Sequence, residues 1–357
     1  MRQLTGTLVT LVIGLAGTPA CHAFHDGGVA SCNSCHTMHN LQDGQLIDPD
    51  NPHGNPDLLT HSTPSDLCLS CHAEAFGAVF GPDPLVPPPE KGAGNFVFLL
   101  EDNLNDAPDG AVNPISGDAA GHNLNAPSFG VAADGTHVTS PGGGYPSSQL
   151  GCTSCHDPHG NQNFRFLYGA RVTSGEGYNF LYPAPLADGI DLLGGIETKN
   201  YHSAYRAGMS QWCGNCHHSF LQEHRGSRFE HSTSDLLEWD QVNAYNLYNG
   251  ADDPFGGDPA LAYLAQVPFE DSASSIQSTA GPTATSRIIC LSCHRAHATS
   301  GPHSGRWDFN IDFLDTDGAV SGSYPIPNPY TTPRQGPLCA KCHGPEDPSE
   351  PITDPTR

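Results

Sequence analysis

The sequence predicts a fold of mostly irregular coil, with short helices and few short strands, held together by something other than a large aliphatic core. Glycine and proline account for 40 and 32 of the 357 residues, and only 37% of the chain is hydrophobic. Such a composition approaches that of low-complexity chains. However, 15 phenylalanines, 11 tyrosines and 3 tryptophans are spread along the sequence, which argues against wholesale disorder.

The cysteines indicate what organises such a chain. Of the 13 cysteines, Cys21 lies near the N-terminus, and all the others fall into Cys-x-x-Cys pairs that are each followed at once by histidine. Histidine occupies only 20 of the 357 positions, so its recurrence after every pair is not a coincidence. The motifs are Cys32/Cys35/His36, Cys68/Cys71/His72, Cys152/Cys155/His156, Cys213/Cys216/His217, Cys290/Cys293/His294 and Cys339/Cys342/His343.

Cys-x-x-Cys-His is the attachment signature of a c-type haem, whose vinyl groups the two thiols bind while the histidine binds the iron. Disulfides, a thiol redox site or a zinc site also use cysteine pairs, but none needs a histidine directly after each pair. We therefore expect six covalently bound c-type haems in a single cytochrome domain over residues 24–357. The haems would form most of the buried apolar mass, and their thioether bonds would staple the chain.

Residues 1–23 are typical of a secretory signal peptide. Arg2 is the only charge, Leu8 to Ala16 is the apolar run, and a small-x-small cleavage site ends at Ala23. A retained membrane anchor or a lipid attached to Cys21 are the alternatives. No later stretch approaches the roughly 20 apolar residues of a membrane span. We expect export through the periplasm to the cell surface or the medium, and the net charge of −24 disfavours nucleic acid as a partner.

The spacing of the motifs shows no fixed period, which excludes a solenoid of equal repeats. Along the chain, the second motif is expected in a short helix that starts near Pro64, and the sixth in a short turn. We expect strands at 95–100 and 163–172, and helices at 204–219, 234–248 (with Ser234 as its cap), 258–267 and 286–297. Residues 48–56 and 101–149 are expected to be loop or coil, 81–94 a stiff extended connector, and 315–318 a solvated turn rather than a calcium loop.

Each haem iron needs a ligand on its second face. Beyond residue 23 the only methionines are Met38 and Met209, whereas many histidines remain outside the motifs. His/His ligation with low potentials is therefore expected, and saturated irons argue for electron transfer rather than catalysis. His39, His159 and His297 each lie three residues after a motif histidine, on the same side of that turn, which favours binding to a neighbouring haem. The alternative is a surface or supporting role for each.

With its six motifs, the chain resembles the OmcS-like hexahaem c-type cytochromes, which polymerise into extracellular electron-conducting filaments, or nanowires. The resemblance rests on residues 24–40, 141–160, 208–217, 290–298 and 338–343. It implies an irregular fold around a continuous chain of haems in which parallel-stacked and T-shaped pairs alternate. The distal iron ligands that it implies are His25, His39, His122, His159, His231 and His297, of which His25, His122 and His231 rest on the resemblance alone. The rivals are His53, His61, His137, His202, His218, His224 and His303.

The resemblance also implies that His39 caps a haem of the neighbouring subunit, the one bound by Cys290 and Cys293. A contact of this kind between unlike surfaces does not close, and so it makes a head-to-tail homopolymer. The expected partners are therefore further copies of the chain, redox proteins and extracellular electron acceptors. One alternative is a monomeric periplasmic shuttle in which His39 finds its iron within the chain. The other is a multihaem oxidoreductase with one open haem face.

Overall fold

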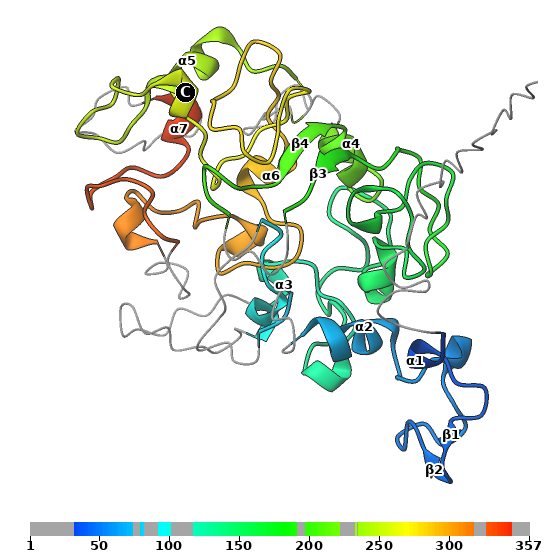
Figure 1. The fold of residues 1–357 in the computed structure, drawn as a ribbon. Helices are drawn as coiled ribbons and strands as arrows, with labels where there is room; N and C mark the ends of the chain where they lie inside the picture. Colours follow the sequence, from blue (N-terminus) through cyan, green and yellow to red (C-terminus); the bar gives the residue numbers. More distant parts are fainter. Residues whose placement is uncertain are drawn as a thin grey trace, which may run out of the picture.

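The computed structural model describes residues 32–73, 79–81, 92–100, 117–190, 197–221, 233, 235–317 and 326–344. The expected signal peptide and the histidines at 25, 224 and 231 lie outside these residues. Over the described ranges the chain is mostly coil with short helices and strands (Figure 1), which confirms the predicted fold class. The longest described helices, α2 (Pro64–His72) and α5 (Trp239–Leu247), have nine residues each.

The other regular elements are shorter, and most of the motifs lie on them. The remaining α-helices are α1 (Cys32–Cys35), α3 (Gly117–Ala120), α4 (Met209–Cys213), α6 (Cys290–Cys293) and α7 (Ala340–His343). The strands β1 (Leu41–Gln42) and β2 (Gln45–Leu46) pair antiparallel, as do β3 (Leu186–Asp188) and β4 (Ala204–Ala207). The 3₁₀ turns are η1 (Pro56–Leu58), η2 (Phe96–Leu100), η3 (Pro127–Phe129), η4 (Ser147–Gln149), η5 (Cys152–Ser154), η6 (Phe164–Phe166), η8 (His218–Leu221), η9 (Pro259–Leu261), η10 (Pro302–Ser304) and η11 (Leu314–Thr316).

The two long helices confirm the sequence prediction at their positions. Helix α2 begins with Pro64 after Thr63, whose hydroxyl oxygen accepts a hydrogen bond from the Asp66 amide at 3.0 Å, the usual arrangement of an N-cap. Helix α5 begins later than predicted, because its N-cap is Glu238, whose amide donates to the Gln241 side chain at 3.0 Å. The predicted cap at 234 lies outside the described residues.

Three other helix predictions were too long. The 204–219 segment divides into strand β4, helix α4 and turn η8, and Gly208, with a φ of 86°, separates the strand from the helix. Only Pro259–Leu261 is helical within 258–267, as a 3₁₀ turn, and only Cys290–Cys293 is helical within 286–297. The sixth motif, expected in a turn, forms the four-residue helix α7. Short helices suffice here because each has only to carry one motif.

Both strand predictions in the apolar stretches were wrong. Residues 96–100 form the 3₁₀ helix η2, whose first four side chains are all buried. The Asn95 carboxamide oxygen accepts the amides of Gly81 and Val97, both at 3.0 Å, and thereby bends the chain at its start. In the 163–172 segment, Arg165 and Phe166 have φ values of 50° and 58°, in the left-handed region that a strand cannot use.

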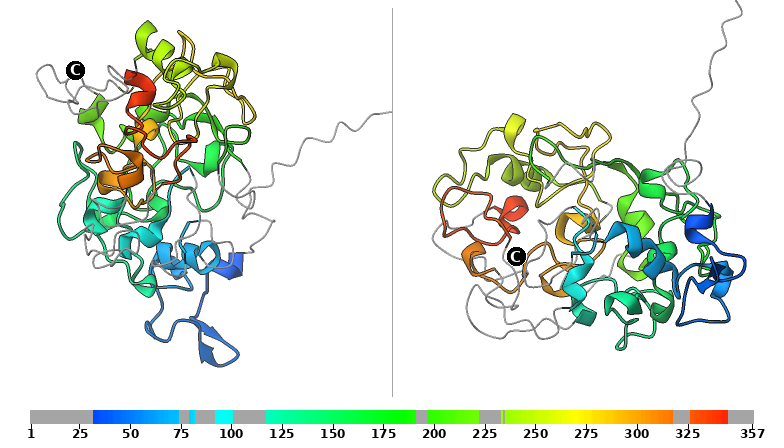
Figure 2. Two further views of the ribbon diagram at one scale, coloured as in Figure 1. Left: turned by 90° about the vertical axis from the view of Figure 1, so that its left-hand side faces the viewer. Right: turned by 60° about the horizontal axis from the view of Figure 1, so that its bottom comes forward.

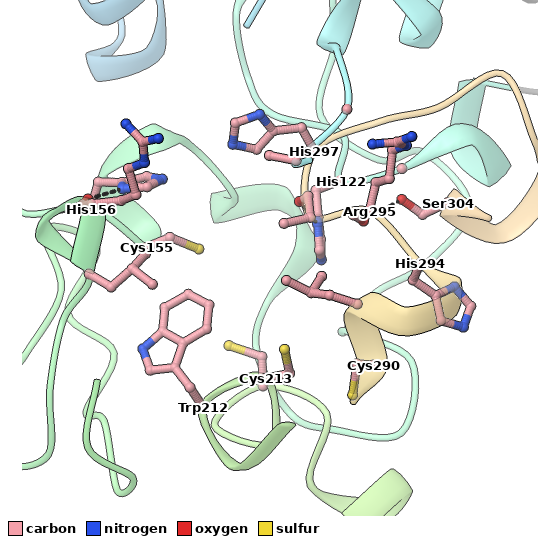
Figure 3. Close-up of a pocket in the computed structure, with 18 of the residues that line it drawn as sticks. His122, Cys155, His156, Trp212, Cys213, Cys290, His294, Arg295, His297 and Ser304 are labelled. Atoms are coloured by element: carbon pink, nitrogen blue, oxygen red, sulfur yellow. Dashed lines mark hydrogen bonds between the residues drawn. The ribbon is translucent and has the colours of Figure 1, made fainter. Parts of the chain in front are cut away.

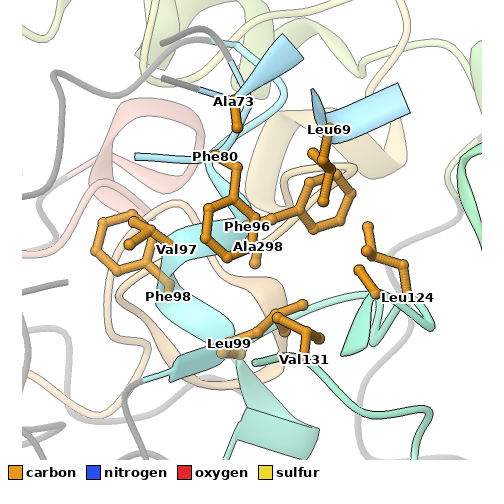
Figure 4. Close-up of a cluster of buried hydrophobic side chains, with 12 residues drawn as sticks. Leu69, Ala73, Phe80, Phe96, Val97, Phe98, Leu99, Leu124, Val131 and Ala298 are labelled. Atoms are coloured by element: carbon orange, nitrogen blue, oxygen red, sulfur yellow. The ribbon is translucent and has the colours of Figure 1, made fainter. Parts of the chain in front are cut away.

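Buried side chains form small separate clusters rather than one core. Figure 4 shows the first, in which η2 packs against helix α2 and the segment around Leu124 and Val131. A second surrounds Tyr245 and Trp307. Motif cysteines pack against the edges of both clusters: Cys152 on the first, and Cys293, Cys339 and Cys342 on the second. The buried apolar side chains thus form separate clusters, and motif cysteines pack against two of them.

The first and last motifs lie at opposite ends of the molecule. Helix α1 and the β1–β2 hairpin project at one end, and α7, packed on α5, lies at the other; all views in Figures 1 and 2 agree on this. Nowhere in the part of the chain that the structure describes is there a helix with the length and apolar character to cross a membrane.

Candidate haem-binding sites

The motif cysteines follow one another in space in the same order as in the sequence. None of the twelve forms a disulfide. Each motif has a thiol close enough to a thiol of the next motif for the two to interact. The neighbouring thiols are Cys35 and Cys71, Cys68 and Cys152, Cys155 and Cys216, Cys213 and Cys290, and Cys293 with Cys339 and Cys342.

The contact between the second and third motifs matches the contact between the fourth and fifth. Helix α2 contacts η5 in the first case, and helix α4 contacts α6 in the second. The Ser65 hydroxyl accepts the Cys152 amide at 3.3 Å, and the Ser210 hydroxyl accepts the Cys290 amide at 3.2 Å. The two contacts therefore have the same construction.

A large cavity connects the motifs in the middle of the chain. Its volume is about 1890 Å³, roughly twice the upper end of ordinary small-molecule pockets, which is about 1,000 Å³. Thiols and histidines of the second to fifth motifs line it, and Figure 3 shows Cys155, Cys213 and Cys290 directed toward it with His122 and His297 on the opposite side. Such a space is suited to several large flat apolar groups held side by side.

The first, third and fifth motifs are each followed by the same return turn. In each, a 3₁₀ turn with left-handed residues brings a backbone carbonyl to the motif histidine. The Nδ1 atoms of His36, His156 and His294 lie 3.0, 2.7 and 2.9 Å from the carbonyl oxygens of Asp57, Arg165 and His303. We call this arrangement the carbonyl clamp.

The carbonyl clamp also uses two matching backbone hydrogen bonds in every copy. The residue after the motif histidine donates its amide to the second left-handed residue, at 2.7, 2.9 and 2.8 Å. The second cysteine of the motif accepts an amide from beyond the turn, at 2.9, 3.0 and 2.7 Å. The clamped amides are those of Thr37, Asp157 and Arg295, and the accepting cysteines are Cys35, Cys155 and Cys293.

These contacts prepare the histidines to bind a metal. A histidine that donates Nδ1–H to a carbonyl keeps its Nε2 lone pair free for a ligand bond and has a fixed ring orientation. Outside the clamps, His217 and His122 have the same arrangement, with Nδ1 at 2.7 Å from the Pro141 carbonyl and 2.6 Å from the Ala296 carbonyl. The structure thus holds motif and non-motif histidines in the same way.

Three pairs of imidazoles have their ring centres at about the separation that a shared metal requires. With metal–nitrogen bonds of about 2.0 Å, two opposed imidazoles have ring centres roughly 6.3 Å apart. The ring centres of His36 and His159 are 6.3 Å apart, those of His156 and His297 6.4 Å, and those of His122 and His217 5.9 Å. In each pair one ring belongs to a motif and the other is a predicted distal ligand. The residues present therefore fit iron porphyrins bound on both faces.

Burial lowers the pKa of the histidines in two of these pairs, and His297 is an example. Burial, followed by the nearby His156 and His122, lowers the pKa of His297 to about 3, and burial with His122 lowers the pKa of His217 to about 4. Both rings are therefore neutral, as metal binding requires. Phe96 stacks on His297 with ring centres 4.4 Å apart, and the buried Nδ1 of His297 has no hydrogen-bond partner among the residues that the structure describes.

Several rival histidines have other structural roles. His202 is buried against Tyr263, and its two ring nitrogens lie 2.9 Å from the carbonyls of Ser203 and Ser278. Nδ1 of His137 contacts the Asp134 carboxylate, and Nδ1 of His61 contacts the Thr60 hydroxyl, both at 3.0 Å. His39, in contrast, is exposed. It lies in the sequence between α1 and β1, two elements that project at one end of the molecule (Figure 1).

The carbonyl clamp is the feature of the site that sequence reasoning missed. The sequence indicates the clamp only weakly, because the segments between motif and turn differ in length. Two of the three turns begin with a proline, in Asn55-Pro56 and Gly301-Pro302. Of the 315–318 segment, which was expected to be a solvated turn, residue 318 lies outside the described residues and Asp317 is buried. Asp317 accepts the amides of Asp308 and Ile326, both at 2.8 Å.

The chain is 31% identical to the C-type cytochrome OmcS of Geobacter sulfurreducens, over 90% of this chain and 89% of that protein. The chain belongs to the OmcS family. No general family model matches it.

Two solved structures share the fold of this OmcS family member. One is the outer membrane cytochrome S filament from Geobacter sulfurreducens, with a TM-score of 0.75, and the other is that of the OmcS nanowires, with a TM-score of 0.74. In each case the identity is 26%, and the match covers 90% of this chain and 99% of the other. This chain therefore shares its irregular backbone, which its composition predicts, with the solved OmcS filament structures.

Proposed function

We propose that the protein is a secreted hexahaem c-type cytochrome that assembles head to tail into filaments and conducts electrons along its haems to extracellular acceptors. The observation that carries this proposal is the order of the motifs, which run from one end of the molecule to the other with each motif next to its successor. When bound, haem supplies reversible one-electron chemistry at its iron. Membership of the OmcS family supports the filament.

The ring pairs support three intrachain iron sites. Numbering the haems by their motifs, we assign His159 to haem 1 opposite His36, His297 to haem 3 opposite His156, and His122 to haem 4 opposite His217. The separations of 6.3, 6.4 and 5.9 Å support these pairs. For haems 2 and 6, opposite His72 and His343, His25 and His231 are proposed. They precede the first and fifth motifs as His122 precedes the third.

The remaining site, haem 5, draws its distal ligand from another subunit. His159 follows the third motif and serves haem 1, and His297 follows the fifth motif and serves haem 3. By the same rule, haem 5 opposite His294 takes its ligand from a histidine that follows a first motif. That residue is His39, which is exposed at the far end of the molecule and can reach haem 5 only in a neighbouring copy.

Electron microscopy of the purified protein tests the polymer. Filaments are expected from the wild-type chain, and uniform single particles at every concentration would instead favour the monomeric shuttle. In the His39→Ala variant, haem attachment should be unchanged, because His39 is outside the motifs, but filaments should be absent. Filaments of normal length from His39→Ala would contradict the assignment.

Electron paramagnetic resonance tests the intrachain ligands. His297→Ala should convert about one haem in six to the high-spin form, because haem 3 loses a ligand. His202→Ala is the matched control, since His202 is equally buried but has both ring nitrogens near carbonyls, and all haems should stay low-spin. A high-spin haem in the wild-type protein would instead favour the oxidoreductase alternative.

A further inference from the structure

Arg306 carries a buried positive charge that binding of the haems through the motifs does not require. Its side chain is only 2% exposed. The backbone amide of Arg306 donates to the Cys293 carbonyl at 2.7 Å, and its side-chain Nε donates to the Leu291 carbonyl at 2.5 Å. Both carbonyls belong to helix α6, which carries the cysteines of the fifth motif. The guanidinium is therefore fixed to the turn that would hold haem 5.

Neutral carbonyls hold the rest of the Arg306 guanidinium. Its Nη1 and Nη2 atoms donate to the carbonyls of Ala265 and Gly92, both at 3.3 Å. Within the described part of the chain, no carboxylate forms an ion pair with this group. Glu197 acts on it only electrostatically, because the Glu197 carboxylate accepts the Ser203 amide at 2.7 Å. The carbonyls orient the charge, but they do not cancel it.

The charge on Arg306 is permanent. An arginine guanidinium stays protonated throughout the neutral pH range, because its ordinary pKa is about 12 or higher. Water and salt screen a charge of this kind on the surface, but they screen it much less in the interior of a protein. The fifth motif therefore lies in a positive electrostatic potential that changes little with pH or ionic strength.

The other two clamped motifs have a different electrostatic environment. At the third motif, the Thr153 hydroxyl donates to the Glu176 carboxylate, and the half-buried Arg165 donates from Nη2 to the Ile190 carbonyl at 2.6 Å. Charges of opposite sign thus offset each other there. At the first motif, no residue of α1 is buried, so solvent screens the charges around it. Of these three sites, we expect the strongest positive potential at the fifth.

We propose that Arg306 raises the reduction potential of haem 5, so that an electron is held more strongly there than at haems 1 and 3. Reduction of ferric to ferrous iron adds one electron and moves no proton, and a fixed positive charge stabilises the form with the extra electron. This inference rests on the proposed function. In that assignment haem 5 is the site capped by His39 of the neighbouring subunit, so Arg306 sets the potential at the passage between molecules.

A redox titration of the purified protein, followed by absorption, tests the role of Arg306. One unit charge at roughly 10 Å, with an effective dielectric constant of about 20, changes an equilibrium between two charge states about tenfold. Arg306→Gln should therefore lower the ratio of reduced to oxidised haem 5 about tenfold at a given applied potential. For a one-electron couple, this equals a shift of about 59 mV.

Two further variants separate the charge from a merely structural role. Arg306→Lys keeps the charge and should hold the potential close to that of the wild type. Arg206→Gln is the matched control, because it removes an arginine that is 43% exposed and lies 2.9 Å from the Asp188 carboxylate, and its titration should equal that of the wild type. If Arg306→Gln does not fold, Arg306→Met, of similar volume, replaces it in the same titration.

The His39→Ala background isolates haem 5. In that variant haem 5 lacks its distal ligand, so its high-spin electron paramagnetic resonance signal can be followed against potential by itself. The same tenfold change should appear when Arg306→Gln is added, and an unchanged midpoint would overturn the inference. Absence of the high-spin signal would overturn the assignment of His39 instead. The absorption titration then decides the inference, since about one-sixth of the haem should shift to lower potential in Arg306→Gln.

Discussion

Replacing Asn40 with alanine should loosen the loop that presents His39. The Asn40 side chain is 4% exposed. Its Nδ2 donates to the carbonyls of Asp48 and Asn51 at 3.1 and 2.8 Å, and its Oδ1 accepts the Asp48 amide at 2.8 Å. At about 1 kcal/mol for each hydrogen bond, the substitution costs about 3 kcal/mol. The φ of 46° at Asn40 adds to this, because alanine tolerates the left-handed region less well than asparagine does.

Hydrogen exchange measures the loss of stability in the loop that contains Asn40. The loop projects from the body of the molecule, so the cost should appear as local opening rather than global unfolding. Exchange of the Ile47 and Asp48 amides, which donate to Asn40, should accelerate about 100-fold, while amides in helix α5 keep their rates. If His39 joins the subunits, the critical concentration for filaments should rise by up to the same factor.

Two further variants separate the effect of the lost hydrogen bonds from the effect of the left-handed backbone at Asn40. Asn40→Gly loses the same hydrogen bonds but relieves the left-handed strain, so its effect should be smaller than that of alanine. Asn55→Ala loses the bonds to the Asp48 carboxylate at 2.8 Å and the Leu59 carbonyl at 3.2 Å, and should cost about 2 kcal/mol. Wild-type exchange rates at Ile47 and Asp48 in Asn40→Ala would refute the reasoning.

Two other predictions concern the body of the molecule. Phe98→Ala should lower the free energy of unfolding by about 3–5 kcal/mol, because Phe98 is only 1% exposed; a thermal melt within a degree of wild type would contradict this. Burial acts to raise the pKa of Asp271, but hydrogen bonds, chiefly from Ser286, outweigh it and lower that pKa. Stability should therefore be full above about pH 4, the unfolded pKa, and fall as the pH drops through the lower folded pKa. Asp271→Asn should flatten this acid-side loss in unfolding curves, and an unchanged slope would contradict the role.

The sequence predicts well those elements whose conformation depends on residues within or next to the element. Helix α2 follows from Thr63 and Pro64 at its start, and the excess of coil follows from glycine and proline. The strand predicted at 95–100 failed because an apolar run does not specify a partner. Its side chains are buried on all sides by α2 and the Ala298 segment, which lies about 200 residues away in the sequence.

The three carbonyl clamps also show that a sequence pattern does not specify contacts with later segments of the chain. Unequal spacing excluded equal repeats, yet three carbonyl clamps of matching geometry recur. Each clamp depends on a carbonyl that arrives from 9 to 21 residues later in the chain. Insertions between motif and turn change the spacing without changing the hydrogen bonds. Periodicity in the sequence was therefore lost while the geometry was retained.

The sequence by itself predicts where haem attaches, because a Cys-x-x-Cys-His motif places both thiols and one imidazole on a single short turn. It also determined, through scarce methionine, that histidine is the expected second ligand. Only the tertiary structure decided which rings lie close together. His122 and His217 are 95 residues apart, and His156 and His297 are 141 apart. Their separations of 5.9 and 6.4 Å are fixed by the packing of distant segments, which no local pattern encodes.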